Sequence, residues 1–243
     1  LVAEWMIGRR GQKNPINTMS DLAASHGKTR AWATIGVSGV LAAFLILSFY
    51  SVIGGWSLNY TLSSVIGTFN GQDADSIGAL FSGMLGSPTT LLLWHTAFIV
   101  LVIGIVARGV TKGLESAART MMPALVVLML ILVGYGMTSG YFGETLSFMF
   151  SPDWDALDGG VVLAAMGQAF FTLSLGMGIM MAYGSYLGED VNLISTARTV
   201  IILDTAIALL AGLAIFPIVF ANGLSAGEGP GLIFVTLPLV TAD

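Results

Sequence analysis

The sequence predicts an all-α polytopic membrane protein. Hydrophobic residues make up 55% of the 243 residues and charged residues only 9%, whereas an ordinary soluble domain has about 25% charged residues. The mean hydropathy is +0.86. Several long stretches reach the roughly 20 residues that cross a hydrocarbon core as an α-helix. Lipid is therefore the expected solvent for most of the chain.

The apolar stretches define the expected spans in order. The first, 1–8, is short and is interpreted as the cytoplasmic end of a helix. The next exceeds the bilayer thickness, so we expect it to tilt or protrude. A proline, Pro123, lies inside the third complete span, where neighbouring helices must satisfy the freed carbonyl. The expected spans are 1–8 (end only), 31–62, 89–107, 117–137, 159–187 and 193–221.

The charges assign a side to each loop. Basic residues cluster before the second span and around the turn between the third and fourth, and Arg198 lies near the start of the last span, whereas 63–88, 138–158 and 222–243 carry only acids. The positive-inside rule then makes loops 9–30, 108–116 and 188–192 cytoplasmic and loops 63–88, 138–158 and 222–243 external. The net charge of −5 reflects this sidedness, and no basic surface suits nucleic acid. Without cysteine the chain has no disulfide framework and no thiolate metal site.

The span 159–187 carries an unusual polar cluster at mid-depth. Gln168, Thr172 and Ser174 precede a Gly-Met-Gly run at 176–178, and each glycine weakens a helix by about 1 kcal/mol relative to alanine. Small residues also let membrane helices approach closely. Two interpretations stay open at this point: close packing, or a discontinuous helix whose free backbone groups line a binding site.

Asp204 is the one charged residue inside the span 193–221 apart from Arg198 near its start. An ionised aspartate at mid-span costs about 2.5 to 3.5 kcal/mol on insertion scales. Its helical neighbours at three and four residues, Val200, Leu203, Ile207 and Ala208, offer no partner. A bound cation, a hydrogen bond from another helix and a titrating proton remain the three interpretations.

Six ordered sequence strings resemble the neurotransmitter:sodium symporter family. They are 4–9 (EWMIGR), 50–56 (YSVIGGW), 108–115 (RGVTKGLE), 167–176 (GQAFFTLSLG), 211–216 (AGLAIF) and 229–234 (GPGLIF). The resemblance implies an inverted-repeat transporter fold with discontinuous helices. It covers the end of helix two to the external loop after helix seven.

The resemblance also implies a substrate site. Tyr50 matches the tyrosine that holds the substrate carboxylate, and Ile46, one turn earlier on the same face, would contact the substrate side chain. Phe171 matches an aromatic lid and Tyr186 a cytoplasmic gate. The remaining positions expected to line the substrate pocket are Ser174, Gly176, Met177 and Gly178.

A sodium site follows from the same resemblance. Thr172 matches a sodium ligand, and Asp204 stands where most relatives have asparagine; hard cations such as sodium prefer such oxygen ligands. In chloride-dependent relatives a serine four residues later binds the anion, but here that residue is Ala208. We expect the Asp204 carboxylate, with Gln168 nearby, to replace chloride. Once sodium leaves, the low dielectric favours its neutral form, so proton antiport is a secondary expectation.

The expected function is sodium-coupled symport of a neutral, hydrophobic or aromatic L-amino acid, and not an enzymatic reaction. A smaller amino acid or an amine, and an amino-acid-gated channel or sensor of the same fold, remain alternatives. A membrane protease is disfavoured because the chain lacks a second membrane aspartate and a His-Glu-x-x-His motif. The expected partners are the amino acid, sodium ion and membrane lipid, with a homodimer left open. Cysteine-free, unglycosylated loops favour a bacterial inner membrane.

Overall fold

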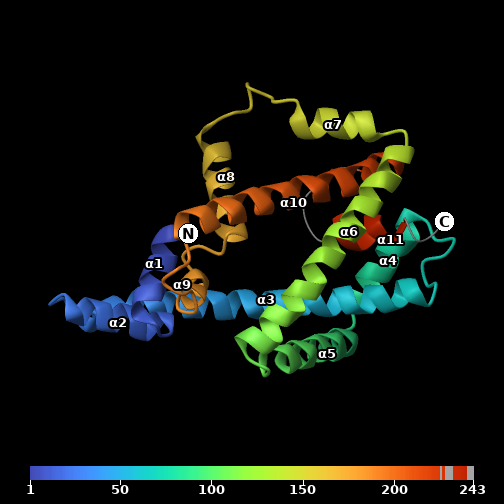
Figure 1. The fold of residues 1–243 in the computed structure, drawn as a ribbon. Helices are drawn as coiled ribbons and strands as arrows, with labels where there is room; N and C mark the ends of the chain where they lie inside the picture. Colours follow the sequence, from blue (N-terminus) through green and yellow to red (C-terminus); the bar gives the residue numbers. More distant parts are fainter. Residues whose placement is uncertain (225, 228–231, 240–243) are drawn as a thin grey trace. The chain divides into compact units, whose positions relative to one another are not determined.

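The computed structural model describes residues 1–224, 226–227 and 232–239 (Figure 1). In this part of the chain the regular elements are all helices, which confirms the expected all-α fold. The chain forms two compact units: unit 1 contains Leu1–Ser48 and Pro152–Ala206, and unit 2 contains Phe49–Ser151 and Ile207–Asp243. Part of the expected loop 222–243, including the start of the string 229–234, lies outside the described residues.

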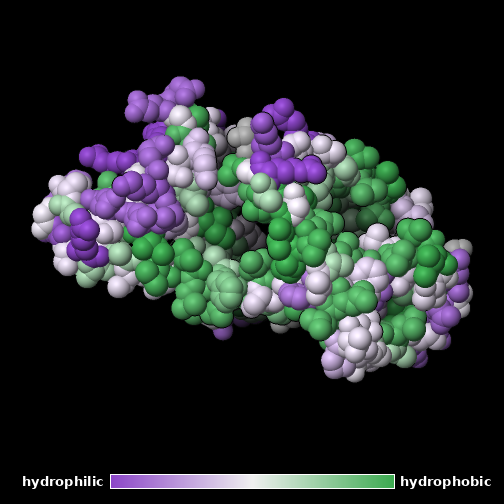
Figure 2. Space-filling model, turned by 90° about the horizontal axis from the view of Figure 1, so that it is seen from below, coloured by the Kyte–Doolittle hydropathy of each residue, from purple (hydrophilic) through white to green (hydrophobic). Residues whose placement is uncertain are grey.

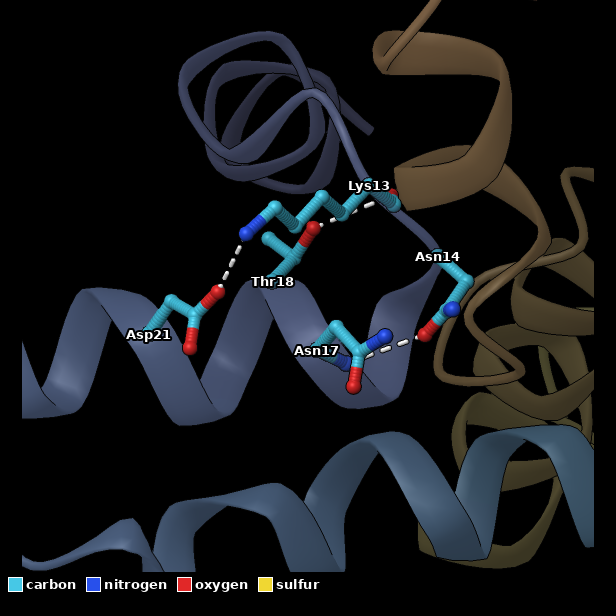
Figure 3. A network of polar contacts seen from close by, with 5 residues as sticks. All are labelled: Lys13, Asn14, Asn17, Thr18 and Asp21. Atoms are coloured by element: carbon cyan, nitrogen blue, oxygen red, sulfur yellow. Dashed lines mark hydrogen bonds and ion pairs between the residues drawn. The ribbon is translucent and has the colours of Figure 1, made fainter.

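Unit 1 begins with two short helices whose boundary is fixed by polar groups (Figure 3). Asn14 caps the second helix by accepting a hydrogen bond from the Asn17 backbone N–H at 3.0 Å, and Pro15 follows where no donor is needed. Lys13 pairs with Asp21 at 2.7 Å. The helices of unit 1 are α1 (Val2–Gly11), α2 (Pro15–Ser25), η1 (Arg30–Trp32), the first part of α3 (Ala33–Val65), α8 (Gly159–Thr172), α9 (Ile179–Gly184) and the first part of α10 (Leu193–Ala221).

Unit 2 holds helices in both external loops expected before α8. Asp73 caps the first of these helices by accepting from the Ser76 backbone N–H at 2.8 Å. Pro123 lies inside a helix that continues through it, as the sequence predicted. The elements of unit 2, besides the rest of α3 and α10, are α4 (Ala74–Leu85), α5 (Pro88–Val106), the π-helix η2 (Val110–Glu115), α6 (Ser116–Thr138), α7 (Phe142–Phe150), the π-helix η3 (Leu232–Thr236) and α11 (Leu237–Leu239).

Among the described residues, four helices are long and apolar enough to cross a membrane: Arg30–Val65, Pro88–Val106, Lys112–Thr138 and Leu193–Ala221. The apolar stretch 159–187 behaves differently because it forms two shorter helices, α8 with 14 residues and α9 with 6. A non-helical segment, 173–178, separates them. The expected discontinuous helix is therefore present.

The packing of unit 1 depends on close approach of backbones. Gly8 of α1 lies against the Met181 carbonyl of α9, and a Cβ on Gly184 would lie 2.6 Å from the Trp5 carbonyl oxygen. Trp5 is buried with Leu193 of α10. Figure 1 shows α9 beside α1. Two glycines at the crossing thus bring the helices together, as is common in membrane bundles.

The packing of unit 2 combines a close backbone approach, where a Cβ on Gly55 would lie 2.8 Å from the His95 nitrogen, with a cluster of aromatic rings. Phe69 and Ile77 are buried together. Tyr60 lies 5.2 Å from Phe69 and 5.2 Å from Phe234 between ring centroids, and Phe234 stacks on Phe81 at 5.5 Å. Edge-on and offset contacts of this kind stabilise a core beyond the area they bury. This cluster joins α3, the loop before α4, α4 itself and η3.

Candidate functional site

The break between α8 and α9 starts with a defined cap. The Leu175 N–H donates to the Phe170 carbonyl at 2.9 Å and the Ser174 N–H donates to the Phe171 carbonyl at 3.0 Å. This pair of bonds is the Schellman motif, which requires a left-handed residue after the helix. Ser174 takes that position with φ of 53°, where glycine is usual. Strained backbone of this kind concentrates at functional sites.

The glycines of the Gly-Met-Gly run are needed for their backbone conformation. Gly176 has φ of 80° and Gly178 has φ of 71°, both in the region that favours glycine. Met177 between them has its backbone against Gly39 of α3, where a Cβ would lie 2.9 Å from the Met177 carbonyl carbon. Both earlier interpretations of the run therefore hold, since its backbone is closely packed and the helix is broken.

Glu4 of α1 binds a backbone N–H group of the break. Its Oε1 accepts a hydrogen bond from the Gly176 N–H at 2.7 Å. In a continuous helix this N–H would donate to the carbonyl of Thr172, four residues earlier. The carboxylate therefore takes the donor that Thr172 would otherwise receive. The other Glu4 oxygen, Oε2, is buried and has no partner among the described residues.

Sequence reasoning missed this role of Glu4. The residue was used only as part of the string 4–9, and its partner lies 172 positions further along the chain. One local signal was available: a carboxylate in an otherwise apolar helix end is costly unless it has a donor. That signal indicates a partner without saying which residue provides it.

Thr172, the predicted sodium ligand, is the last residue of α8. Its hydroxyl makes only a long hydrogen bond, 3.4 Å, to the Ala169 carbonyl, and its own carbonyl has lost the Gly176 donor. Both oxygens belong to one residue at a helix break. Released carbonyls and hydroxyls are the ligands that sodium takes in transporters with discontinuous helices.

Asp204 lies in the unit 1 part of α10 and is half-buried. Within the described part of the chain its carboxylate forms no hydrogen bond and no ion pair. No hydrogen bond joins it to the break in these residues either. The hydrogen-bonded interpretation of Asp204 thus gains no support within this chain, and the cation and proton interpretations both stand.

The other predicted residues lie on three different segments. Phe171 is 44% exposed at the end of α8 and Tyr186 is 67% exposed after α9. Gln168 is exposed on α8, and Ile46 is half-buried on α3. Tyr50 belongs to unit 2, where its ring lies edge-on to Phe49 with centroids 5.8 Å apart. The structure therefore brings together the break residues and Glu4.

A conventional divalent-metal centre is not formed by the described residues. They contain no group of three or more His, Asp or Glu side chains placed to hold a metal ion. At the break, Thr172 offers one hydroxyl and one released carbonyl. Such oxygen ligands fit a monovalent hard cation better than a transition metal, which prefers imidazole or thiolate.

Comparison with known proteins places the chain in a family. The model of the sodium:neurotransmitter symporter family matches residues 82–242. An uncharacterized sodium-dependent transporter of Bacillus subtilis strain 168, YhdH, is 41% identical over 240 residues, which is 99% of this chain and 52% of that protein. A second uncharacterized sodium-dependent transporter, from Haemophilus influenzae, is 32% identical over 99% of this chain and 54% of that protein.

A solved structure agrees with these relatives. The crystal structure of MhsT in complex with L-phenylalanine superposes with a TM-score of 0.90 at 48% identity, covering 99% of this chain and 54% of that one. The chain therefore spans about half the length of the relatives it matches. The expected inverted-repeat transporter fold is the fold of this neighbour.

Proposed function

The chain belongs to the sodium:neurotransmitter symporter family, and on that premise we propose that the whole protein carries a neutral, hydrophobic or aromatic L-amino acid across a bacterial inner membrane together with sodium. Two findings support the proposal. The bacterial relatives are named sodium-dependent transporters, and the MhsT structure holds L-phenylalanine. Transport here means alternating access of one site to the two sides of the membrane.

The observation that carries the proposal is the hydrogen bond between Glu4 and Gly176. Because Glu4 accepts the Gly176 N–H at 2.7 Å, the Thr172 carbonyl is left available to a cation beside the Thr172 hydroxyl. The sodium ion supplies positive charge to the site when bound. Thr172 and Asp204 are its proposed ligands, and the substrate carboxylate completes the set.

The substrate would bind at the same break. Tyr50 would donate its hydroxyl to the substrate carboxylate, and Phe171 would close over the site while Tyr186 gates the cytoplasmic side. Phe171 lies at the end of α8, directly before Thr172, and its side chain is 44% exposed. The side-chain pocket would be lined by Ile46, Ser174, Gly176, Met177 and Gly178.

Asp204 would make transport independent of chloride. Its carboxylate has no cationic partner in the described residues, so it can balance the charge of sodium where relatives use an anion. Gln168 would lie nearby as a neutral donor. On the return to the outward-facing state the carboxylate would carry a proton instead, since an uncompensated charge at this depth is costly.

Uptake by the full-length protein in proteoliposomes tests the proposal. We expect sodium-dependent, chloride-indifferent accumulation of a bulky neutral amino acid from a radiolabelled panel. Thr172→Val should raise the sodium concentration for half-maximal uptake about tenfold, equivalent to about 1.4 kcal/mol. Thr199→Val is the matched control, because Thr199 is exposed and bonds only to the Ser195 carbonyl in its own helix.

Each alternative gives a different result in the same experiment. If only glycine-sized amino acids or amines accumulate, the assignment of a bulky neutral substrate is wrong, but sodium-coupled symport still holds. An ion current larger than a fixed number of sodium ions per transported amino acid would allow indicates a channel. Sodium-dependent binding of the amino acid without its accumulation indicates a sensor. A chloride requirement in the wild-type protein would contradict the role given to Asp204. The variant Asp204→Asn should lower uptake. Asp155→Asn is its control, because Asp155 is exposed.

A further inference from the structure

A small apolar groove lies at the start of the first long membrane helix, in unit 1. Its volume is about 220 Å³, roughly that of seven water molecules at about 30 Å³ each. It is lined by Ile7, Met19, Leu22, Ala23, Lys28 and Trp32. The candidate membrane span begins at Arg30, two residues before Trp32 of the groove, so we expect the groove to lie where that helix enters the membrane.

A second Schellman motif fixes the backbone of Lys28, the charged residue that lines this groove. The Lys28 N–H donates to the Ala23 carbonyl at 2.8 Å and the Gly27 N–H donates to the Ala24 carbonyl at 3.1 Å. Gly27 has φ of 67°, the left-handed conformation that this motif requires. The turn therefore brings the Lys28 backbone back over the end of α2, next to the apolar groove.

The charges around the groove are unbalanced. Segment 9–30 contains five basic residues and one acid, Asp21. Lys13 pairs with Asp21 at 2.7 Å, and Arg9 donates to the carbonyls of Gly188 and Val191. Lys28 is exposed and forms no ion pair with any described residue. Figure 2 shows hydrophilic side chains gathered at the α2 end of unit 1, beside hydrophobic ones.

We propose that this groove binds one anionic phospholipid of the cytoplasmic leaflet. Part of an acyl chain occupies the apolar groove, the headgroup phosphate pairs with Lys28, and Trp32 lies at the membrane–water boundary, where tryptophan is favoured. Basic pockets on the cytoplasmic side attract anionic headgroups. The excess of positive charge selects an anionic lipid over a zwitterionic one, and a groove of this volume is too small for a folded peptide element.

Lipid retention by the purified full-length protein tests the proposal without reference to transport. Native mass spectrometry would count bound phosphatidylglycerol and phosphatidylcholine with identical acyl chains. We expect retention of phosphatidylglycerol at least fivefold above phosphatidylcholine. Lys28→Gln should remove this preference, and Ala23→Phe, which fills the groove, should lower retention of both. Ala23→Leu serves if the larger residue prevents folding.

Two matched variants should leave retention unchanged. Lys112→Gln removes the same charge from another loop, and Ala24→Phe adds the same ring to an exposed position of α2 outside the groove. Equal retention of the two lipids, or an unchanged preference in Lys28→Gln, overturns the proposal. It is also overturned if Ala23→Phe destabilises the protein with no change in bound lipid, because the bound lipid then lies elsewhere.

Discussion

The two units of this chain share close glycine contacts, but they differ in what surrounds these contacts. In unit 1 the backbones of α1 and α9 approach each other at Gly8 and Gly184, and α9 follows the helix break. Unit 2 interlocks rings, with Phe69 and Tyr60 at its centre. Backbone contact leaves carbonyl and N–H groups near one another and so builds polar sites, whereas ring contact removes apolar surface from lipid or water and builds stability. The unit with the better ring core lacks the helix break.

Truncating a buried ring in unit 2 should have the largest effect. Phe69 is 2% exposed, so Phe69→Ala removes a filled volume and leaves a cavity, which costs about 3–5 kcal/mol. Thermal unfolding of the purified protein measures the loss. Phe150→Ala is the control because Phe150 is 52% exposed; equal loss in both variants would show that ring packing does not set the stability of unit 2.

Adding a methyl group in unit 1 should have the next largest effect. The Cβ of Gly8→Ala would collide with the backbone carbonyl of Met181, and backbone cannot move aside cheaply, so we expect a loss of about 2–3 kcal/mol. In Gly134→Ala, inside α6, the Cβ would meet nothing within 4 Å, and the better helix propensity should stabilise by up to about 1 kcal/mol. Opposite signs in the two thermal shifts are the expected result.

Variants of Glu4 measure how much its hydrogen bond contributes to the stability of unit 1, apart from the glycine packing. Glu4→Ala leaves the Gly176 N–H without its 2.7 Å acceptor, which costs about 1–2 kcal/mol. The free N–H should then compete for the Thr172 carbonyl and raise the sodium concentration needed for uptake. Glu4→Gln keeps an acceptor oxygen and should restore most of the stability. If both variants bind sodium like the wild type, the released carbonyl is not a ligand.

The smallest expected effect distinguishes two exposed carboxylates, one in each unit. Hydrogen bonding and charge from Lys13 lower the pKa of Asp21 below 3.8, and hydrogen bonds from Ser76 lower the pKa of Asp73 below the same value. A lowered folded pKa means that each contribution to stability is present above about pH 3.8 and is lost as the pH falls through the folded value.

Salt should separate the two causes. An exposed ion pair is screened at high ionic strength, so 1 M salt should move the pKa of Asp21 back toward 3.8. The pKa of Asp73 should move less, because its hydrogen bonds at the helix start persist. Carboxyl carbon shifts in NMR titrations, assigned with Asp21→Asn and Asp73→Asn, measure both values. Equal salt responses would contradict the assignment of causes.

Local patterns predicted most of the fold but few of its contacts. Uncharged length predicted long helices in the regions of α3, α5, α6 and α10, and the Gly176 and Gly178 pair left a break and close packing as two interpretations. The helices within the external loops, α4 and α7, were not predicted. Both are amphipathic and short, and the residue that caps α4, Asp73, is of a type that is also typical of loops.

The candidate site was predictable only where its residues are neighbours in sequence. Ser174 and Thr172 were identified from the string 167–176, but the left-handed conformation of Ser174 was not, because serine rarely adopts it. Glu4 was missed because hydrogen bonds between distant segments leave no periodic signal. The roles of Tyr50 and Asp204 rest on family resemblance and remain predictions.

The long sequence separation of the α1 contacts has a consequence for biosynthesis. Glu4 bonds a residue 172 positions later, and Arg9 bonds the Val191 carbonyl 182 positions later. At about 5–20 residues per second, ribosomes need roughly 10–35 s to make the partners. During that interval the Glu4 carboxylate lacks its Gly176 donor. The helix break therefore assembles late, and the nascent chain carries an unpaired acid in the membrane until α9 emerges.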